Sequence, residues 1–300
     1  MIDLRYHIAS IVAVFLALAL GILIGSTIVG DNLIVEQQKK MIDRLELQFY
    51  DLRESEAILS SDNLRLNKII SNYENYSQTL IPALVKGRLE GTQIGVIISG
   101  DNELPAGMIN ALSSAGAAIV SKTVVLSGLS LQDEEVRKRV IEFYGLETDS
   151  ENDVLRQYIA RSVATVIENN GAPEVVEFLQ NNNLVKFSGA NKTPLAGVII
   201  LGGANDYSFY FVDSFDSALI DELNNNSIKV YGVEQYQAVY SYMEQYSQKN
   251  ISTIDNVELS LGQISLVFAM AGEPGNYGMK TTAKKLMPTL PVEGIWGQSQ

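Results

Sequence analysis

The chain has 300 residues, a formal net charge of −13 and no cysteine. The lack of cysteine excludes disulfide bonds and thiolate metal sites. From Gly91 onward there are 24 acidic and 13 basic residues, a balance of −11. Nucleic-acid binding and docking on anionic lipid both depend on clustered Lys and Arg, so this balance argues against either partner for residues 91–300.

An apolar segment without formal charges opens the chain. Between Arg5 and Asp31 the only titratable base is His7. The core of the segment, IASIVAVFLALALGILIGSTIVG, is long enough as a helix to cross a hydrocarbon layer of about 30 Å. We therefore predict a single transmembrane anchor within residues 1–30. A cleaved signal peptide is the alternative, although its apolar part is usually only about 7–15 residues long.

The charges that flank the span do not settle its orientation. A count of bases would put the C-terminal side in the cytoplasm. The acids nearest the span, Asp31 and Glu36, favour the reverse. Long domains are translocated largely regardless of their charge.

Small residues recur at steps of four inside the apolar segment, from Ala9 onward. Such a row lets two helix backbones approach closely in lipid. It predicts a helix-dimer face made of Ala13, Ala17, Gly21 and Gly25. A row that meets only lipid is the alternative.

A heptad pattern follows the apolar segment. Leucine recurs every seven residues at Leu45, Leu52, Leu59 and Leu66, while the matching d positions Gln48, Ser55 and Asp62 are polar. The pattern predicts a coiled-coil stalk over residues 31–85 with a weak centre, and a homo-oligomer through anchor and stalk. A single helix that folds back on the domain is the alternative. Pro82 and the Lys86-Gly87-Arg88 stretch are expected to end the helix, and residues 86–92 to form a linker.

Residues 93–285 alternate between short apolar runs and amphipathic stretches. The expected strands are Gln93–Ile98, Ala117–Leu126, Gly197–Leu201, Lys229–Val233 and Ser252–Ile254. The expected helices are Pro105–Ala115, Asp133–Tyr144, Asp153–Asn169, Pro173–Asn181, Asp213–Asn224, Gln235–Tyr246 and Ser260–Ala271. The alternation predicts an α/β domain, Rossmann-like, with a mostly parallel sheet covered by helices on both faces. Residues 286–300 are expected to form an extended tail.

The turns that follow the buried strands carry no nucleotide fingerprint. After Leu201 the sequence runs Gly202, Gly203, Ala, Asn, Asp206, which is neither GxGxxG nor a Walker loop. A ligand at this turn is one interpretation, and a tight turn that needs glycine is the other. Asp213 and Asp216 are expected as acids at a helix N-terminus. The chain contains neither GxSxG nor HExxH, so we expect no enzyme, no catalytic residue and no cofactor.

Seven of the fourteen tyrosines lie between Tyr207 and Tyr246. The pairs Tyr236/Tyr240 and Tyr242/Tyr246 have the i, i+4 spacing of a helix. The cluster could stack on sugars or hold a partner protein. Core packing with the hydroxyls at the rim is the alternative.

The N-terminal block MIDLRYHIASIVAVFLALALGILIGS and the C-terminal pieces STIDNVE and GQISLVFAMAGEPGNYGMKTTAKKLMP resemble the family of the mycobacterial copper transport protein B. The resemblance covers essentially the whole chain in order. It implies a bacterial cell-envelope protein in copper transport or homeostasis, with its N-terminus inside and its bulk outside the cytoplasm. It supplies no site residues.

Two functional hypotheses follow. The first is a single-span envelope protein of copper homeostasis, and copper is implied only by the resemblance. The second is a bitopic coiled-coil scaffold or regulator in cell-envelope or division complexes, with no metal chemistry of its own. Copper(I) prefers Cys, Met and His ligands. Here cysteine is absent, His7 is the single histidine and the methionines are scattered, so the residues favour the scaffold and the resemblance favours copper.

Overall fold

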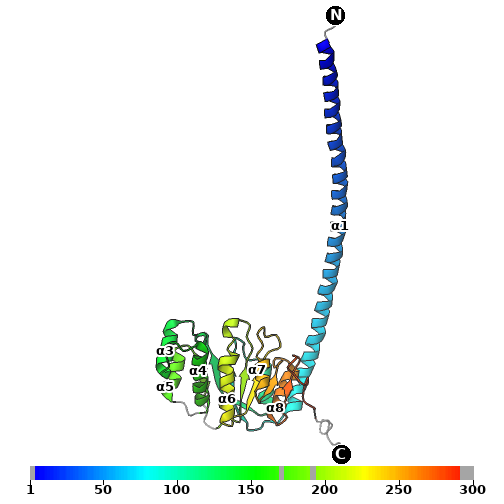
Figure 1. Cartoon of the computed structure of the whole chain (residues 1–300). Coiled ribbons are helices and arrows are strands. Elements are labelled where there is room, and N and C mark those ends of the chain that lie inside the picture. The colour runs from blue at the N-terminus through cyan, green and yellow to red at the C-terminus, as the bar shows by residue number, and fades with distance from the viewer. Residues whose placement is uncertain (1–3, 169–171, 190–193, 291–300) are drawn as a thin grey trace, which may run out of the picture. The chain divides into compact units, whose positions relative to one another are not determined.

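The computed structural model describes residues 4–168, 172–189 and 194–290. The chain divides into two compact units, Met1–Asn72 and Tyr73–Gln300. The second unit is called the head below. Helix α1, Leu4–Val85, supplies the first unit and continues into the head (Figure 1).

In the first unit, the segment Arg5–Ser26 of α1 has a mean hydropathy of 2.8. Among the described residues it is the one helical segment that is long and apolar enough to cross a membrane. Beyond it the helix carries many charged side chains and has no Gly or Pro between residues 31 and 81. Both parts form one helix because neither contains a residue that stops it.

The end of α1 belongs to the head. Pro82 lies inside the helix, which continues to Val85. Proline removes one backbone donor but leaves its own carbonyl free, and this carbonyl accepts the N–H of Lys86 at 3.2 Å. Ile81 and Val85 are buried in the head core, so packing holds the last turn in helical form. Residues 73–85 thus belong to the same compact unit as the sheet.

The head is built on a seven-stranded sheet in the order β3-β2-β1-β4-β5-β6-β7. All neighbours are parallel except β2 and β3, so the predicted mostly parallel sheet is confirmed. The strands are β1 Gln93–Ile98, β2 Ala118–Val125, β3 Val185–Gly189, β4 Gly197–Leu201, β5 Val230–Val233, β6 Ser252–Ile254 and β7 Asn276–Tyr277.

Helices cover both faces of this sheet. They are α2 Ala106–Ser114, α3 Glu134–Tyr144, α4 Asn152–Ile167, α5 Pro173–Asn181, α6 Ser217–Asn225, α7 Met243–Gln248 and α8 Ser260–Met270. Two 3₁₀ turns, η1 Ser127–Ser130 and η2 Tyr207–Phe209, and one π-helical turn, η3 Val212–Asp216, follow strand ends. In Figure 1, α3, α5, α4 and α6 lie along the head as neighbours, in agreement with their contacts.

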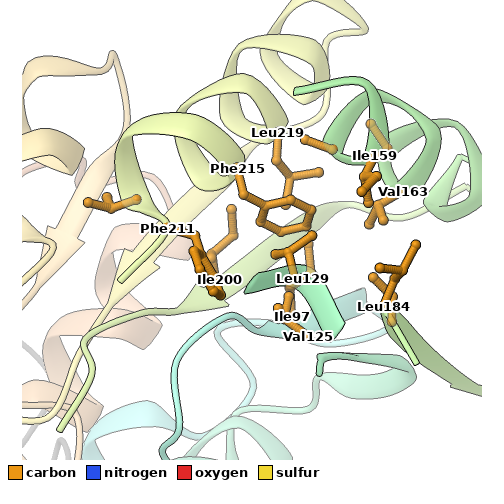
Figure 2. Close-up of a cluster of buried hydrophobic side chains, with 14 of the residues drawn as sticks. Ile97, Val125, Leu129, Ile159, Val163, Leu184, Ile200, Phe211, Phe215 and Leu219 are labelled. Atoms are coloured by element: carbon orange, nitrogen blue, oxygen red, sulfur yellow. The ribbon is translucent and has the colours of Figure 1, made fainter. Parts of the chain in front are cut away.

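Alternate residues of the central strands enter two separate cores, as expected for strands buried on both faces. Ile97 and Ile200, which are register partners in β1 and β4, share a core with Val163 of α4 and Phe215 of η3 (Figure 2). The neighbouring Ile98 enters the other core, with α2, α8 and the last turns of α1. Each fully buried aliphatic or aromatic side chain contributes roughly 1.5–3 kcal/mol of transfer free energy.

The expected helix over residues 235–246 is wrong, because helical structure begins only at Met243. The backbone N–H groups that precede Met243 form hydrogen bonds with residues distant in sequence instead of helical ones. Tyr236 donates to the Glu258 carboxylate at 3.0 Å, and Tyr240 forms an isolated bridge with Ala204. Tyr236 and Tyr240 are therefore not a helical pair.

The remaining differences concern weak or short elements. The sequence pattern missed β3 and β7, the antiparallel edge strand and the two-residue strand at the other edge. The N-terminal part of the expected Asp213–Asn224 helix is the π turn η3 rather than α-helix. Of the expected tail, residues 286–290 form neither helix nor strand, and 291–300 lie outside the described residues.

Candidate functional site at the carboxyl edge of the sheet

Three polar residues and one glycine follow the carboxyl ends of four adjacent strands. Ser99 follows β1, Gly202 follows β4, Glu234 follows β5 and Asp255 follows β6. The chain leaves β1 toward β2 on one side and later returns to β4 on the other side, so β1 and β4 flank the topological switch point. Open α/β sheets bind ligands outside the carboxyl ends of their strands at such a point.

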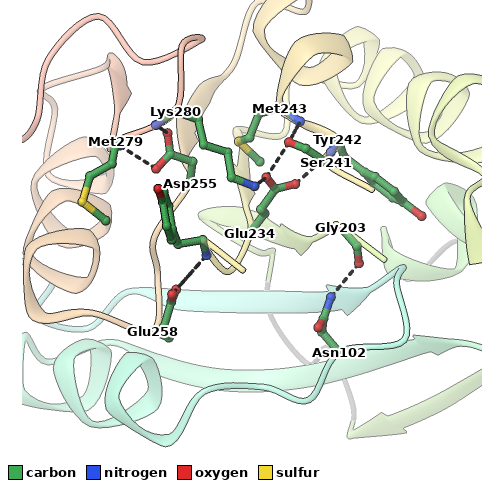
Figure 3. A network of polar contacts seen from close by, with 11 residues as sticks. Asn102, Gly203, Glu234, Ser241, Tyr242, Met243, Asp255, Glu258, Met279 and Lys280 are labelled. Atoms are coloured by element: carbon green, nitrogen blue, oxygen red, sulfur yellow. Dashed lines mark hydrogen bonds and ion pairs between the residues drawn. The ribbon is translucent and has the colours of Figure 1, made fainter. Parts of the chain in front are cut away.

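The loops after β1 and β4 contact each other directly above this point. The Asn102 amide donates to the Gly203 carbonyl at 2.6 Å (Figure 3), and the Asn205 N–H donates to Asp101 Oδ1 at 2.8 Å. Gly100 lies so close to the Gly203 carbonyl that any Cβ there would overlap it. The chain's own loops thus fill the space directly between β1 and β4.

Each glycine of the predicted ligand turn has a packing reason of its own. A Cβ on Gly202 would lie 2.7 Å from the Tyr242 ring and still closer to the Tyr246 hydroxyl. Gly203 has a φ of +80°, which glycine adopts without steric cost. Asp206 is exposed at the start of η2 and accepts the Ser208 N–H at 2.8 Å, a bond that lowers the pKa of its carboxyl. The ligand at this turn stays a prediction.

Beneath Gly202 lies a buried polar cluster made of Asp216, Ser99 and Tyr246. Asp216 is inaccessible to solvent. Its Oδ2 accepts the Ser99 hydroxyl at 2.7 Å and the Tyr246 hydroxyl. Its Oδ1 is buried and has no hydrogen-bond partner among the described residues. Burial raises the pKa of Asp216 to about 6, against the lowering effect of the two hydroxyl donors.

Asp216 lies at the N-terminus of α6, as expected, but its side chain does not cap that helix. Sequence analysis missed its partners because Ser99 is 117 residues away and Tyr246 is 30 residues away. Burial and the carboxylate raise the pKa of Tyr246 well above its ordinary value, which keeps the phenol a donor. The cluster holds α6, α7 and the end of β1 together.

A second buried carboxylate, Glu234, fastens the loops after β5 (Figure 3). It accepts the Tyr242 N–H at 2.8 Å and the Ser241 hydroxyl at 2.6 Å, and it forms an ion pair with Lys280. Glu234 is inaccessible to solvent, whereas the Lys280 side chain is 18% exposed. Desolvation of such a pair is offset only because the carboxylate is fully hydrogen-bonded.

Asp255, after β6, holds the C-terminal strap of the head, residues 278–280. Its carboxylate accepts the N–H groups of Met279 and Lys280 at 2.7 and 2.8 Å. Gly278 has a φ of +139° and lies against the same carboxylate, where a Cβ would overlap it. The carboxyl edge is therefore covered by a strap that two buried acids hold in place.

These buried groups form hydrogen bonds with other groups of the head. Ser99 is 2% exposed and its hydroxyl donates a hydrogen bond to Asp216. Within the described ranges no group of three or more His, Cys, Asp or Glu side chains is arranged to hold a metal ion. Among the soft ligands, Met108 and Met243 are buried in the two different cores.

The residues of the predicted helix-dimer face and seam lie on α1. A Cβ on Gly21 or Gly25 would meet no atom within 4 Å. The seam side chains are exposed by 46% at Leu45, 62% at Leu52, 69% at Leu59 and 52% at Leu66. The pairing of both rows stays a prediction.

The tyrosine cluster divides into a buried and an exposed part. Tyr242 and Tyr246 are fully buried, their rings meeting edge to face at 6.0 Å. Tyr207 is 67% exposed and stacks on Tyr210 with a centroid distance of 5.6 Å. Core packing therefore accounts for the first two tyrosines but not for Tyr207.

Fold and sequence together define an α/β protein that carries one N-terminal helix segment of membrane-spanning length. The chain belongs to the family described as "Copper transport outer membrane protein, MctB", whose family model matches residues 1–288. The expected resemblance is thereby confirmed over nearly the whole chain. No curated protein matches the sequence.

Proposed function

We propose that this protein is a single-span envelope component of copper homeostasis that acts by binding other proteins and not by catalysis or by holding copper itself. In this proposal residues 5–26 anchor it in the membrane and residues 31–300 lie outside the cytoplasm. The observation that carries the proposal is the continuity of α1, from an apolar segment through an uncovered leucine row to the core of the head.

The leucine row supports a partner-binding stalk. Four leucines at heptad spacing are 46–69% exposed. Leucine side chains are unfavourable in water, and pairing with another helix would bury them. The polar d positions Gln48, Ser55 and Asp62 weaken self-pairing. A helix that pairs only weakly with a second copy of itself is suited to bind another coiled-coil protein in its place.

The small number of residues that could bind copper(I) supports an indirect role in copper homeostasis. Copper(I) selects thiolate, thioether and imidazole ligands. The chain has no cysteine and one histidine, His7, at the start of the apolar segment. Met108 and Met243 belong to cores on opposite faces of the sheet, so they cannot meet at one ion.

Copper tolerance in a strain that lacks the gene tests this proposal. The full chain should restore tolerance and cellular copper content. So should a variant with Met270, Met279 and Met287 changed to Leu, because these substitutions remove soft ligands but conserve volume. Leu52→Asp with Leu59→Asp should fail. The matched control Leu47→Asp with Leu64→Asp, whose leucines are exposed outside the a and d positions, should restore tolerance.

Failure of the methionine variant at a normal protein level would show that the chain coordinates copper. A strain with unchanged copper tolerance but altered cell shape or division would favour the second candidate, a scaffold for envelope or division complexes. The exposed seam supports that candidate equally.

Labelling of introduced cysteines tests the orientation, since the native chain contains none. Ser113→Cys places a thiol on the exposed side of α2 in the head. It should react with an impermeant maleimide on intact, wall-stripped cells, whereas Ile2→Cys should react only after lysis. The opposite pattern would reverse the orientation.

A further inference from the structure

A cavity of about 310 Å³ lies beside the carboxyl edge, on the side of the exposed tyrosines. The end of η1, the first turn of α4 and the turns η2 and η3 line it. Its size is at the lower end of the roughly 300–1,000 Å³ range of small-ligand sites. None of the groups that line it belongs to the Asp216 or Glu234 clusters.

Aromatic rings form one wall. Tyr207 is 67% exposed, and its ring lies nearly parallel to that of Tyr210, with 13° between the planes. Tyr240 also meets the Tyr207 ring, with a centroid distance of 5.4 Å, and the 67% exposure of Tyr207 leaves ring surface for another flat group. Beside a cavity, such a ring surface is placed to stack on the apolar face of a ligand.

Arg156 is a fixed element of the opposite wall. It donates to the carbonyls of Leu129 and Ser130 at 3.0 and 2.9 Å, and its guanidinium lies 4.8 Å above the Phe211 ring centroid. Asp153 pairs with it at 2.6 Å and offsets its charge. These contacts hold the Arg156 side chain in place before any ligand binds.

Ser214 supplies the second observation. Its side chain is 5% exposed and lines the cavity, yet no described residue forms a hydrogen bond with its hydroxyl. This hydroxyl is therefore available to form a hydrogen bond with a ligand group in the cavity. Gln132 and Asp213 add an amide and a carboxylate to the same lining.

We propose that this cavity binds a saccharide ring that carries no phosphate or carboxylate. A pyranose has a C–H face that stacks on a tyrosine and a rim of hydroxyls that donate and accept. The hydroxyl of Ser214, the amide of Gln132 and the carboxylate of Asp213 match that rim. Since Arg156 is neutralised by Asp153, Asp213 leaves the site negative and disfavours acidic or phosphorylated sugars. This inference is independent of the proposed role in copper homeostasis.

Calorimetric titration of the full chain in lipid nanodiscs tests the proposal, because sugar-based detergents would compete. The probes are the N-acetylglucosamine trimer, maltotriose and glucose 6-phosphate. We expect at least one neutral trisaccharide to bind with a Kd between about 0.1 and 1 mM and the phosphorylated sugar to bind more weakly.

Substitutions in the cavity test whether the sugar binds there. Tyr207→Ala should weaken binding at least about tenfold, whereas Tyr207→Phe, which keeps the ring, should stay within about threefold. Ser214→Ala should weaken it about fivefold. The control Tyr236→Ala removes another exposed tyrosine, one that does not line this cavity, and should leave the Kd unchanged. Tyr207 is exposed, so its variants report on the site even if the Ser214 variant does not fold.

Three results would overturn the proposal. One is the failure of both neutral trisaccharides to bind at about 10 mM, well above the expected Kd. Another is an unchanged Kd in a folded Tyr207→Ala variant. The third is tighter binding of glucose 6-phosphate than of the neutral sugars.

Discussion

Tyr246 donates its hydroxyl proton to the carboxylate of Asp216, and both side chains are inaccessible to solvent. The bond joins α7 to the N-terminus of α6 and lies beneath Gly202, which has no side chain to displace it. Ser99 completes the cluster from the end of β1. An acid that sequence analysis assigned to a helix N-terminus thus connects three elements of the head.

The stability of the head should depend on the protonation of Asp216. Its pKa is raised from 3.8 to about 6 in the folded state, so the protonated form is favoured by folding. The contribution, at most about 3 kcal/mol, is present below about pH 4 and is lost as the pH rises through about 6. Thermal unfolding of the full chain followed by near-ultraviolet circular dichroism should show this trend. Asp216→Asn should remove it, and the exposed control Asp149→Asn should keep it.

Gly202→Ala should destabilise the head by roughly 1–3 kcal/mol through overpacking, because the added methyl overlaps Tyr242 and Tyr246. Adding Tyr246→Phe removes the nearest oxygen and should recover part of that loss in a urea titration. Gly145→Ala is a useful contrast: a Cβ there meets no atom within 4 Å, although its φ of +64° still causes backbone strain. Additive effects of the first two changes would show that the methyl does not meet the phenol.

Lys280→Ala should cost about 3–5 kcal/mol, because it leaves the Glu234 carboxylate buried without its cation. The double variant Glu234→Gln with Lys280→Met should be more stable than Lys280→Ala, since no charge then remains in the interior. Denaturant midpoints of the wild type and these variants measure the difference. A small effect of Lys280→Ala would mean that Ser241 and the Tyr242 N–H suffice for the carboxylate.

Self-association through α1 should be weak in the stalk and stronger in the full chain, since the anchor confines both copies to one membrane. Cross-linking in mild detergent should show loss of dimer in Leu52→Asp with Leu59→Asp, and a smaller loss in Gly21→Ile with Gly25→Ile. Leu47→Asp with Leu64→Asp, equally exposed but outside the a and d positions, should still dimerise. A monomeric wild type in native membranes would assign the seam to another protein.

Copper(I) should bind the full chain no more tightly than about micromolar in competition with a chromogenic chelator, because the chain has no thiolate and its single histidine is His7. Binding of one ion per chain in the nanomolar range would contradict the proposed indirect role. The same titration of the variant with Met270, Met279 and Met287 changed to Leu would then identify whether thioethers hold the ion.

Elements with a strong local signal were predicted from the sequence. The runs QIGVII and GVIIL became β1 and β4 with the expected bounds, because a fully buried parallel strand requires an unbroken apolar run between turn residues. The apolar segment and the heptad row were equally local signals. The i, i+4 spacing of Tyr236 and Tyr240 led to the wrong prediction of a helix. Glu258 and Ala204, distant in sequence, bind the backbone groups of these tyrosines. Strand β3 was missed since it is a short, mostly exposed edge strand.

The sequence by itself determined the class of protein: one apolar helix, a heptad helix and an α/β head whose strands alternate with helices. Only the tertiary structure decided what the polar residues do. Asp216 meets Ser99 and Tyr246 across 117 and 30 residues, and Glu234 meets Lys280 across 46. Periodicity reports which face of an element is buried, but the partner of a buried carboxylate depends on how the strand order brings distant loops to one edge of the sheet.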